Sequence, residues 1–261
     1  MLVAQLIAAV ERLAPSALAE EWDNVGLVVG RHNQPARRLL VALELRDEVL
    51  GEARELGCDA VLVHHPPIFP TLAAVTDGSA ASELVLRAAE GRVAVIAAHT
   101  NLDAATGGLN DVMAEILGIG DVQPLRPDPA VPDCGLGRVG SVGSTTLEGI
   151  VERVRSGFGT GPVNYAGDPW TRVERVACCT GSGGSFIPDA REAGADAYVT
   201  SDLKYHDADR AEGLPLVTLP HARAERVAMK RWTKLLERAL APEGVEVSFA
   251  EVETDPWQTA S

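Results

Sequence analysis

Two adjacent histidines, His64 and His65, end the apolar run of the segment AVLVHHPPIF, and two prolines follow them at once. Two later segments each carry a histidine with an acid four positions further on; these are His99 with Asp103, and His221 with Glu225. Imidazole nitrogens and carboxylate oxygens together suit zinc, iron, manganese or nickel. Because the set exceeds the ligands of one tetrahedral ion, it predicts two divalent transition-metal ions per chain. Asp103 and Glu225 are the candidates for a bridging carboxylate.

A helix and a strand precede the two adjacent histidines, and a similar helix and strand occur a second time in the chain. The segment EARELGCDAVLV at 52–63 aligns without a gap on DAREAGADAYVT at 189–200, and both read as a helix, a glycine stop, Asp-Ala and a strand. This register sets His64 and His65 against Ser201 and Asp202. Since ligands of open α/β sheets gather at the carboxyl ends of the strands, we expect two similar α/β halves that bring these polar residues together.

The wider pattern alternates helix and strand, which is typical of an α/β fold with mixed, largely parallel sheets. Helices are expected at 1–14, 46–56, 81–90, 147–158 and 187–193, and strands at 38–43, 60–63, 93–98, 138–142 and 176–179. The segment 121–133 is rich in Pro and Asp and reads as a linker, which divides the chain into halves 1–125 and 126–261. Thr145 and Glu148 have capping-box spacing at the start of one helix.

Composition narrows the classes of protein. The chain has 261 residues, is 46% hydrophobic and can bury a substantial core. Its apolar runs fall short of the roughly 20 residues of a membrane span. A formal charge of -14 makes nucleic acid an unlikely partner. Four cysteines without CxxC spacing, two of them in apolar segments, favour packed thiols in a reducing cytoplasm.

Several residues keep two interpretations. His99 is either a metal ligand or, as we favour, a residue that hydrogen-bonds beside the metals. Asp202 and His206 either make a local loop hydrogen bond or act in the pocket as orienting groups or proton shuttles. The stretch TGSGGS at 180–185 lies between a strand and a helix, where it either holds a phosphate or forms a plain tight turn. Trp22, Asp23 and Asn24 either take part in catalysis or, as we favour, form a structural turn with a buried indole.

Taken in order, several motifs resemble the GTP cyclohydrolase 1 type 2 homolog family, also called NIF-three-like. They are WDNVGLVVG at 22–30, HHP at 64–66, AHTNLD at 98–103, GLND at 108–111, GAD at 194–196 and SDLKYH at 201–206. The resemblance implies a dinuclear metal centre with the ligands His64, His65, Asp103, His221 and Glu225. It also implies two interlinked α/β halves around a metal-binding cleft, and a homo-oligomer in the form of a hexameric ring.

The chain departs from that family at two places. Pro220 and Ala222 flank His221, where the family commonly has a glycine and an aromatic residue. Ser201 precedes Asp202, where the family commonly has glycine. The ligand types are kept, so the departures concern the wall of the pocket beside His221.

Two classes of function fit these residues. The first is a metal-dependent hydrolase acting on a nucleotide, a phosphoester or a cyclic amide C–N bond, with His99 or His206 as proton carrier and Asp202 in the pocket. The family's name suggests opening of the GTP ring, but only by analogy. The second is a non-catalytic metal-binding regulatory or scaffold protein. An open coordination position on the metal would separate the two classes, and residue spacing does not reveal one.

Overall fold

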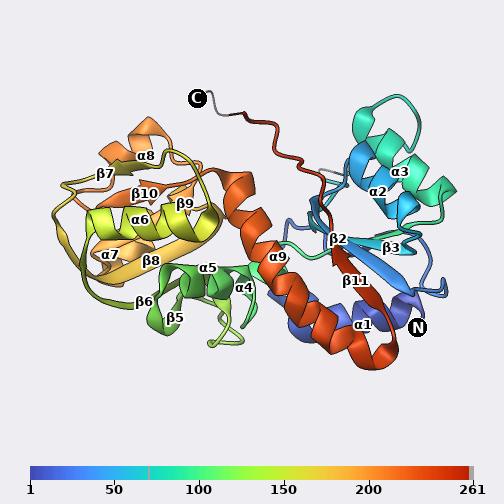
Figure 1. Cartoon of the computed structure of the whole chain (residues 1–261), viewed down its shortest axis with the longest axis horizontal. Coiled ribbons are helices and arrows are strands. Elements are labelled where there is room, and N and C mark those ends of the chain that lie inside the picture. Colours follow the sequence, from blue (N-terminus) through green and yellow to red (C-terminus); the bar gives the residue numbers. More distant parts are fainter. Residues whose placement is uncertain (70, 259–261) are drawn as a thin grey trace. The chain divides into compact units, whose positions relative to one another are not determined.

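The computed structural model describes residues 1–69 and 71–258 and contains two compact units, each built around one β-sheet (Figure 1). The first unit comprises Met1–Ala105 and Met229–Thr254. The second comprises Thr106–Ala228 and the segment that begins at Asp255. The chain therefore leaves the first unit after residue 105 and returns to it inside the long helix α9 (His221–Leu240). Among the described residues, no helix is both long enough and apolar enough to cross a bilayer.

The sheet of the first unit has the strand order β1-β4-β3-β2-β11. Its strands are β1 (Gly26–Val29), β2 (Arg38–Glu44), β3 (Ala60–His65), β4 (Ala94–Ala97) and β11 (Glu246–Phe249). All neighbours run parallel except β1, which pairs antiparallel with β4. This largely parallel arrangement confirms the expected α/β class. The strand expected at 60–63 extends through both histidines.

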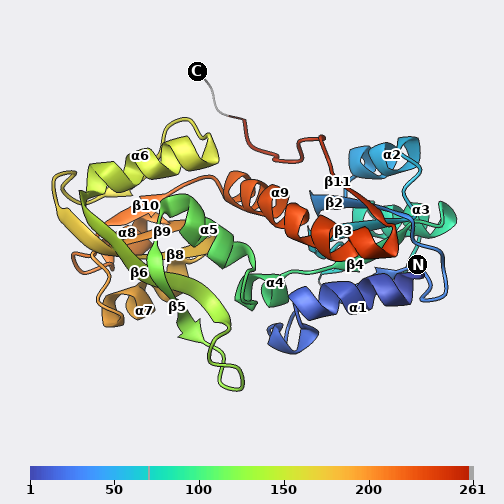
Figure 2. The ribbon, with the colours of Figure 1, turned by 60° about the horizontal axis from the view of Figure 1, so that its bottom comes forward.

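Helices cover both faces of this first sheet (Figure 2). They are α1 (Val3–Leu13), α2 (Asp47–Glu55), α3 (Ala80–Glu90) and the short α4 (Thr100–Ala104). Val49 of α2 and Val85 of α3 pack with Leu40, Val61 and Val95 of the strands in one buried cluster. The two views show α1 against the opposite face. Because both faces are covered, the central strands are continuously apolar rather than alternating.

The sheet of the second unit has the strand order β5-β6-β8-β9-β10-β7. Its strands are β5 (Gly120–Pro127), β6 (Gly135–Thr146), β7 (Asn164–Ala166), β8 (Arg172–Ser182), β9 (Ala197–Ser201) and β10 (Leu216–Thr218). The three strands β8, β9 and β10 run parallel, and the remaining pairs are antiparallel. The expectation that 121–133 is a linker was wrong, because most of this segment is the edge strand β5. Pro124 and Pro127 fit there, since an edge strand needs fewer backbone donors than a central one.

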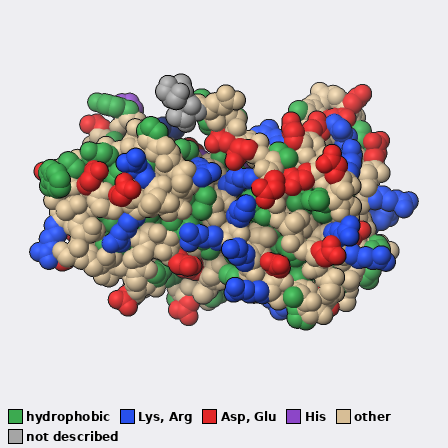
Figure 3. All heavy atoms as spheres, in the orientation of Figure 1, with side chains coloured by type: hydrophobic (Ala, Val, Ile, Leu, Met, Phe, Trp, Pro, Cys, Tyr) green, Lys and Arg blue, Asp and Glu red, His purple; other side chains and the backbone are tan. Residues whose placement is uncertain are grey.

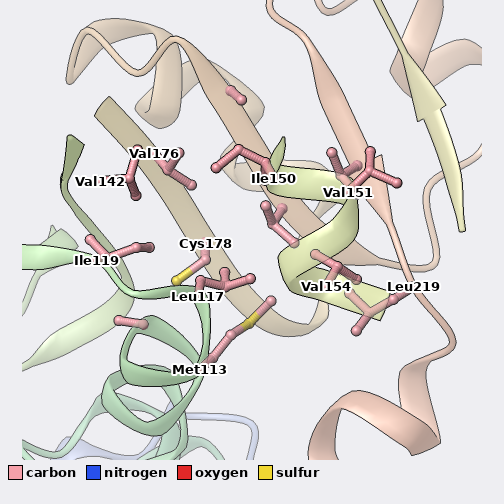
Figure 4. Close-up of a cluster of buried hydrophobic side chains, with 14 of the residues drawn as sticks. Met113, Leu117, Ile119, Val142, Ile150, Val151, Val154, Val176, Cys178 and Leu219 are labelled. Carbon is pink, nitrogen blue, oxygen red and sulfur yellow. The ribbon is translucent and has the colours of Figure 1, made fainter. Parts of the chain in front are cut away.

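The core of the second unit lies on both sides of β8. Its helices are α5 (Leu109–Leu117), α6 (Leu147–Phe158), α7 (Ile187–Glu192), α8 (Tyr205–Asp209) and the first residues of α9. Figure 4 shows Met113 of α5, Val154 of α6 and Cys178 of β8 in one buried cluster, in which Leu117 lies beside Cys178. The next residue, Cys179, faces the other cluster with Ile187 of α7. The expectation of packed cysteines is confirmed for Cys178, since burial raises the pKa of its thiol to about 12.

Helix α6 has the bounds expected from the sequence, but the residue that caps it differs. Its N-cap is Thr146, whose side chain accepts a hydrogen bond from the backbone N–H of Gly149. The capping box expected at Thr145 and Glu148 was therefore wrong by one position. Both threonines precede the helix, and spacing alone does not distinguish them.

Helix α9 carries six of the 23 Lys and Arg residues of an otherwise acidic chain. Figure 3 shows Lys and Arg side chains along the course of this helix on the face drawn, with Asp and Glu side chains on either side. Lys230, Arg231, Lys234 and Arg238 are the exposed basic residues of its second half. This half turns Trp232 and Leu236 inward, so its charged face follows from amphipathic spacing.

Candidate metal centre

The first group of candidate ligands begins at the carboxyl end of β3. His64 is fully buried, and its Nδ1 lies 2.9 Å from the carbonyl oxygen of Ala98. A carbonyl only accepts, so Nδ1 carries the proton and the lone pair of the ring belongs to Nε2. That Nε2 lies 3.7 Å from Oδ2 of Asp103. The fold thus fixes the tautomer that leaves Nε2 of His64 able to coordinate a metal.

His99 and Asp103 come from the short helix α4, which follows β4. His99 is the N-cap residue, and the backbone N–H of Asp103 donates to its carbonyl at 3.0 Å. The two side chains are thus one helical turn apart, as expected from their spacing. The backbone N–H of His99 donates to Oδ1 of Asn101, and the amide of Asn101 donates to the carbonyl of Ala14. These bonds fix the turn from which both side chains project.

His64, His65 and His99 form a compact group. Their ring centroids are 5.0 to 5.7 Å apart, and each ring offers a nitrogen within 4.8 Å of the nitrogens of the other two. Imidazole nitrogens at this separation can converge on one borderline dication such as zinc, iron or nickel. His99 therefore lies among the possible ligands, where the sequence analysis favoured a place beside the metals.

Asp23, which the sequence analysis assigned to a structural turn, is hydrogen-bonded to the candidate residue His99. Its fully buried carboxylate accepts a hydrogen bond from Nδ1 of His99 at 3.0 Å and bonds from the backbone and hydroxyl of Thr100. Burial alone would raise the pKa of Asp23, but the bonds from His99 and Thr100 outweigh it and lower the pKa well below its usual value. A carboxylate that holds Nδ1–H of a histidine commonly orients a metal ligand. The sequence feature that could have pointed to Asp23 is its position as the acidic residue of the motif WDNVGLVVG at 22–30.

The second group belongs to the second unit and is centred on His221, the first residue of α9. Its Nδ1 lies 2.6 Å from Oδ2 of Asp202, and its Nε2 lies 2.9 Å from Oε2 of the buried Glu225. Burial alone would lower the pKa of His221, but Glu225 and Asp202 raise it to about 9. This imidazole is therefore held between two carboxylates, one of which lies one helical turn along α9.

Asp202 positions His221. Its backbone has the left-handed φ of 54°, which aspartate tolerates better than most residues, and Ser182 donates its hydroxyl to the same carboxylate oxygen at 2.8 Å. Burial alone would raise the pKa of Asp202, but the bonds from His221 and Ser182 lower it. Asp202 thus makes hydrogen bonds to both Ser182 and His221, and its role in the pocket stays a prediction.

The glycine-rich stretch at 180–185 packs tightly against this group. Gly181 has φ 67°, and a Cβ at this position would lie 2.7 Å from Oε1 of Glu225. A Cβ at Gly183 would collide with the side chains of Thr200 and Tyr198. Strand β8 continues through Ser182, so the stretch is partly strand. Close packing beside Glu225 and Tyr198 is enough to explain why glycine is needed at both positions. No bound phosphate has to be assumed, so a plain turn is favoured over an anion site.

His206 is placed differently from the other candidates. It is exposed on α8, and among the described residues its ring contacts Tyr205, at 5.3 Å between centroids. The catalytic roles of His99, Asp202 and His206 stay predictions. The same holds for the expectation that the two ligand groups belong to one centre.

Comparison with known proteins assigns the chain to a family. The model of the family Duf34/NIF3 (NGG1p interacting factor 3) matches residues 1–256. The chain belongs to the DUF34/NIF3 family. A relative from Lactococcus lactis, named GTP cyclohydrolase 1 type 2 homolog, is 39% identical over 199 residues, which cover 75% of this chain and 76% of the relative. One of the same name from Clostridium perfringens is 33% identical over 258 residues, 97% of each chain.

Solved structures of this family share the fold. The crystal structure of a Bacillus cereus protein related to NIF3 has a TM-score of 0.93 and 25% identity, and the match covers 100% of this chain and 99% of that one. Reduced HcgD from Methanocaldococcus jannaschii has a TM-score of 0.79 and 27% identity over 97% of this chain and 98% of its own. The resemblance noted from the motifs is confirmed, and the DUF34/NIF3 fold extends over the whole chain.

Proposed function

We propose that this DUF34/NIF3 chain is a metal-dependent hydrolase with two divalent transition-metal ions per chain. Its substrate is a small molecule with a scissile phosphoester bond or cyclic amide C–N bond, nucleotides included. The observation that carries the proposal is the orientation of the His64 ring. His64 donates Nδ1–H to the carbonyl of Ala98, which leaves its Nε2 as the nitrogen that can ligate.

The donor set fits such ions. The proposed ligands are His64, His65 and Asp103 from the first unit and His221 and Glu225 from the second. Neutral imidazole and carboxylate together suit zinc, iron, manganese and nickel, whereas magnesium and calcium prefer oxygen donors alone. When bound, such ions supply Lewis acidity, which lowers the pKa of a coordinated water and polarises the bond to be broken.

Other residues of the chain orient the ligands and carry protons. Asp23 and Asp202 fix the rings of His99 and His221 through Nδ1. Burial of Glu225 and His64 keeps bulk water away from two of the donors, which strengthens electrostatic interactions there. His99, whose side chain is 21% exposed, is the proposed proton carrier at the rim of the first group.

The test combines metal analysis with turnover. The purified chain is analysed for metals and then screened against nucleotides, phosphoesters and cyclic amides; GTP is in the panel because the relatives are named after GTP cyclohydrolase. Activity that a chelator abolishes and added metal restores is the expected result. A full metal complement without turnover across the panel would contradict the hydrolase and favour a non-catalytic metal-binding role.

Three variants test the ligands. His65→Ala and Glu225→Gln are each expected to lose at least one ion per chain, because a ligand or a charge that holds two dications close together is removed. His32→Ala is the control, since His32 is exposed and its backbone carbonyl, which the substitution keeps, accepts a hydrogen bond from the N–H of Ala4. Equal metal content in Glu225→Gln and His32→Ala would remove Glu225 from the site.

The hexameric ring and the cytoplasmic location remain part of this proposal. Both rest on the sequence, namely on the family resemblance and on cysteines without a disulfide pattern. Sedimentation of the metal-loaded chain measures the first, and fractionation of the source cells measures the second.

A further inference from the structure

Two large aromatic side chains of the first unit lie side by side and are half exposed. Trp22 and Phe69 are each 55% exposed, and their ring centroids are 5.6 Å apart at an interplanar angle of 57°. The sequence analysis expected the indole of Trp22 to be buried, and this expectation was wrong. Large aromatic rings bury most of their surface when they serve a core, so the exposure of both rings at one place requires an explanation.

The backbone that carries these two rings is firmly held. Next to Trp22, the buried carboxylate of Asp23 accepts bonds from His99 and Thr100. The backbone N–H of Asp23 donates to the carbonyl of Glu20. The side-chain amide of Asn24 donates to the carbonyl of Ile68 at 2.9 Å, which ties the turn of Trp22 to the segment of Phe69. The rings are therefore presented by a fixed support.

The aromatic pair adjoins the candidate metal ligands of the same unit. The ring of Trp22 lies 6.0 Å from that of His99, edge to face at 73°, and His99 lies 5.7 Å from His65. Phe69 follows His65 in the chain by four residues, behind the two prolines. A planar molecule stacked on this pair would thus lie beside the histidines that the proposed function uses.

We propose that Trp22 and Phe69 form a stacking platform for a planar heteroaromatic ring of the substrate, such as a nucleobase. The inference rests on the proposed function and narrows its substrate to a ring-bearing compound. Stacking on an exposed aromatic face tolerates any base, because every base offers a π-face. The carboxylate of Asp23, next to the platform, already accepts hydrogen bonds from His99 and Thr100. The platform therefore presents an apolar surface to a neutral ring.

The test compares two ligands that differ only in the ring. Binding of a purine nucleoside monophosphate and of ribose 5-phosphate to the metal-loaded full chain is measured by calorimetry. We expect the nucleotide to bind at least about tenfold more tightly, which is within the range for one base stacked on aromatic side chains. Trp22→Ala and Phe69→Ala should each remove most of this difference, whereas Trp22→Phe should keep most of it. Trp170→Ala is the control, since that indole is 75% exposed in the second unit.

Four outcomes decide the inference. A ring-dependent difference that disappears in Trp22→Ala and survives in Trp170→Ala supports it. Equal binding of both ligands, or binding of neither, overturns it. A difference that persists in the double variant of Trp22 and Phe69 also overturns it. So does a change of oligomeric state in Trp22→Ala without a change in ring binding, because the pair would then be an interface between copies of the chain.

The turnover screen of the proposed function, read together with these binding data, separates this inference from that function. Chelator-sensitive hydrolysis that is equally fast for phosphoesters with and without a ring keeps the hydrolase and overturns the platform. Ring-dependent binding without any turnover keeps the platform and overturns the hydrolase.

Discussion

At the scale of single residues, two acids of the candidate site hold histidine rings by hydrogen bonds. Asp23 binds Nδ1 of His99, and Asp202 binds Nδ1 of His221. A carboxylate at Nδ1 leaves Nε2 for coordination and makes it more basic. The two acids therefore fix the orientation of the rings they hold, and each unit contains one such pair.

Replacement of Asp202 by Asn should weaken metal binding about 10- to 100-fold, as is typical for residues that orient a metal ligand. Asparagine tolerates the left-handed backbone at this position and keeps the shape of the side chain. Affinity is measured by competition with a chelator at pH 9, where the proton on His221 competes little. Asp168→Asn, in a turn of the same unit, is the control. An unchanged affinity in Asp202→Asn would show that Asp202 does not position His221 for metal.

Metal affinity should rise with pH through the neutral range. A protonated imidazole cannot ligate, and the pKa of His221 is raised to about 9, so metal must displace a proton at pH 7. This single proton predicts about a tenfold gain in affinity per pH unit below pH 9 and no further gain above it. Chelator competition at several pH values measures the slope. An affinity that is constant between pH 7 and pH 8.5 would contradict this assignment.

The sequence singled out the candidate histidines because each follows an apolar strand, a pattern visible in neighbouring residues. It did not identify Asp23 as the partner of His99, since 76 residues separate the two. Long-range pairs of this kind depend on how segments pack, and no local spacing encodes them. The exposure of Trp22 was missed for the same reason, because whether a ring is covered depends on distant segments.

At the scale of elements, the bounds of helix α6 were predicted correctly, but the residue that caps it was wrong by one position. Its bounds agree with the sequence, because the apolar period and the following Gly159 mark both ends. The cap lies at Thr146 and not at Thr145. Similarly, composition suggested a linker at 121–133, but pairing with β6 makes most of it a strand. Tertiary pairing overrode a local preference there, as it commonly does in sheets.

Thr146→Ala should lower the free energy of unfolding by about 1 kcal/mol, the usual cost of a lost N-cap side chain. Thr145→Ala is the matched control and should change it by no more than about 0.5 kcal/mol. Urea unfolding of both variants at the same pH provides the comparison. A larger decrease in the free energy of unfolding for Thr145→Ala than for Thr146→Ala would instead support Thr145 as the cap, as expected from the sequence.

At the scale of the whole molecule, metal binding should stabilise the chain. A ligand that binds the native state alone, at 100 times its Kd, adds about 2.7 kcal/mol. For a chain of this size, each kcal/mol corresponds to about 2–4 °C, so each ion should raise Tm by about 5–10 °C. Thermal melts with and without chelator measure this difference.

His65→Ala supplies the control for these melts. Because it lacks a ligand, its Tm should respond less to the chelator than that of the unchanged chain, whereas His32→Ala should respond like the unchanged chain. A Tm that the chelator leaves unaltered in the unchanged chain would argue against a metal bound by the folded state.

The path of the chain through its two units has a consequence for its synthesis. Strand β2 is apolar along most of its length, and its outer edge pairs with β11, which is translated roughly 200 residues later. At a translation rate of about 5–20 residues per second, that edge waits on the order of 10–40 s for its partner. The second unit, by contrast, is almost entirely one continuous stretch, Thr106–Ala228, and can fold as it emerges. On the ribosome, the first unit therefore begins before the second unit and is completed after it, and in the meantime its open strand edge is exposed to wrong pairing.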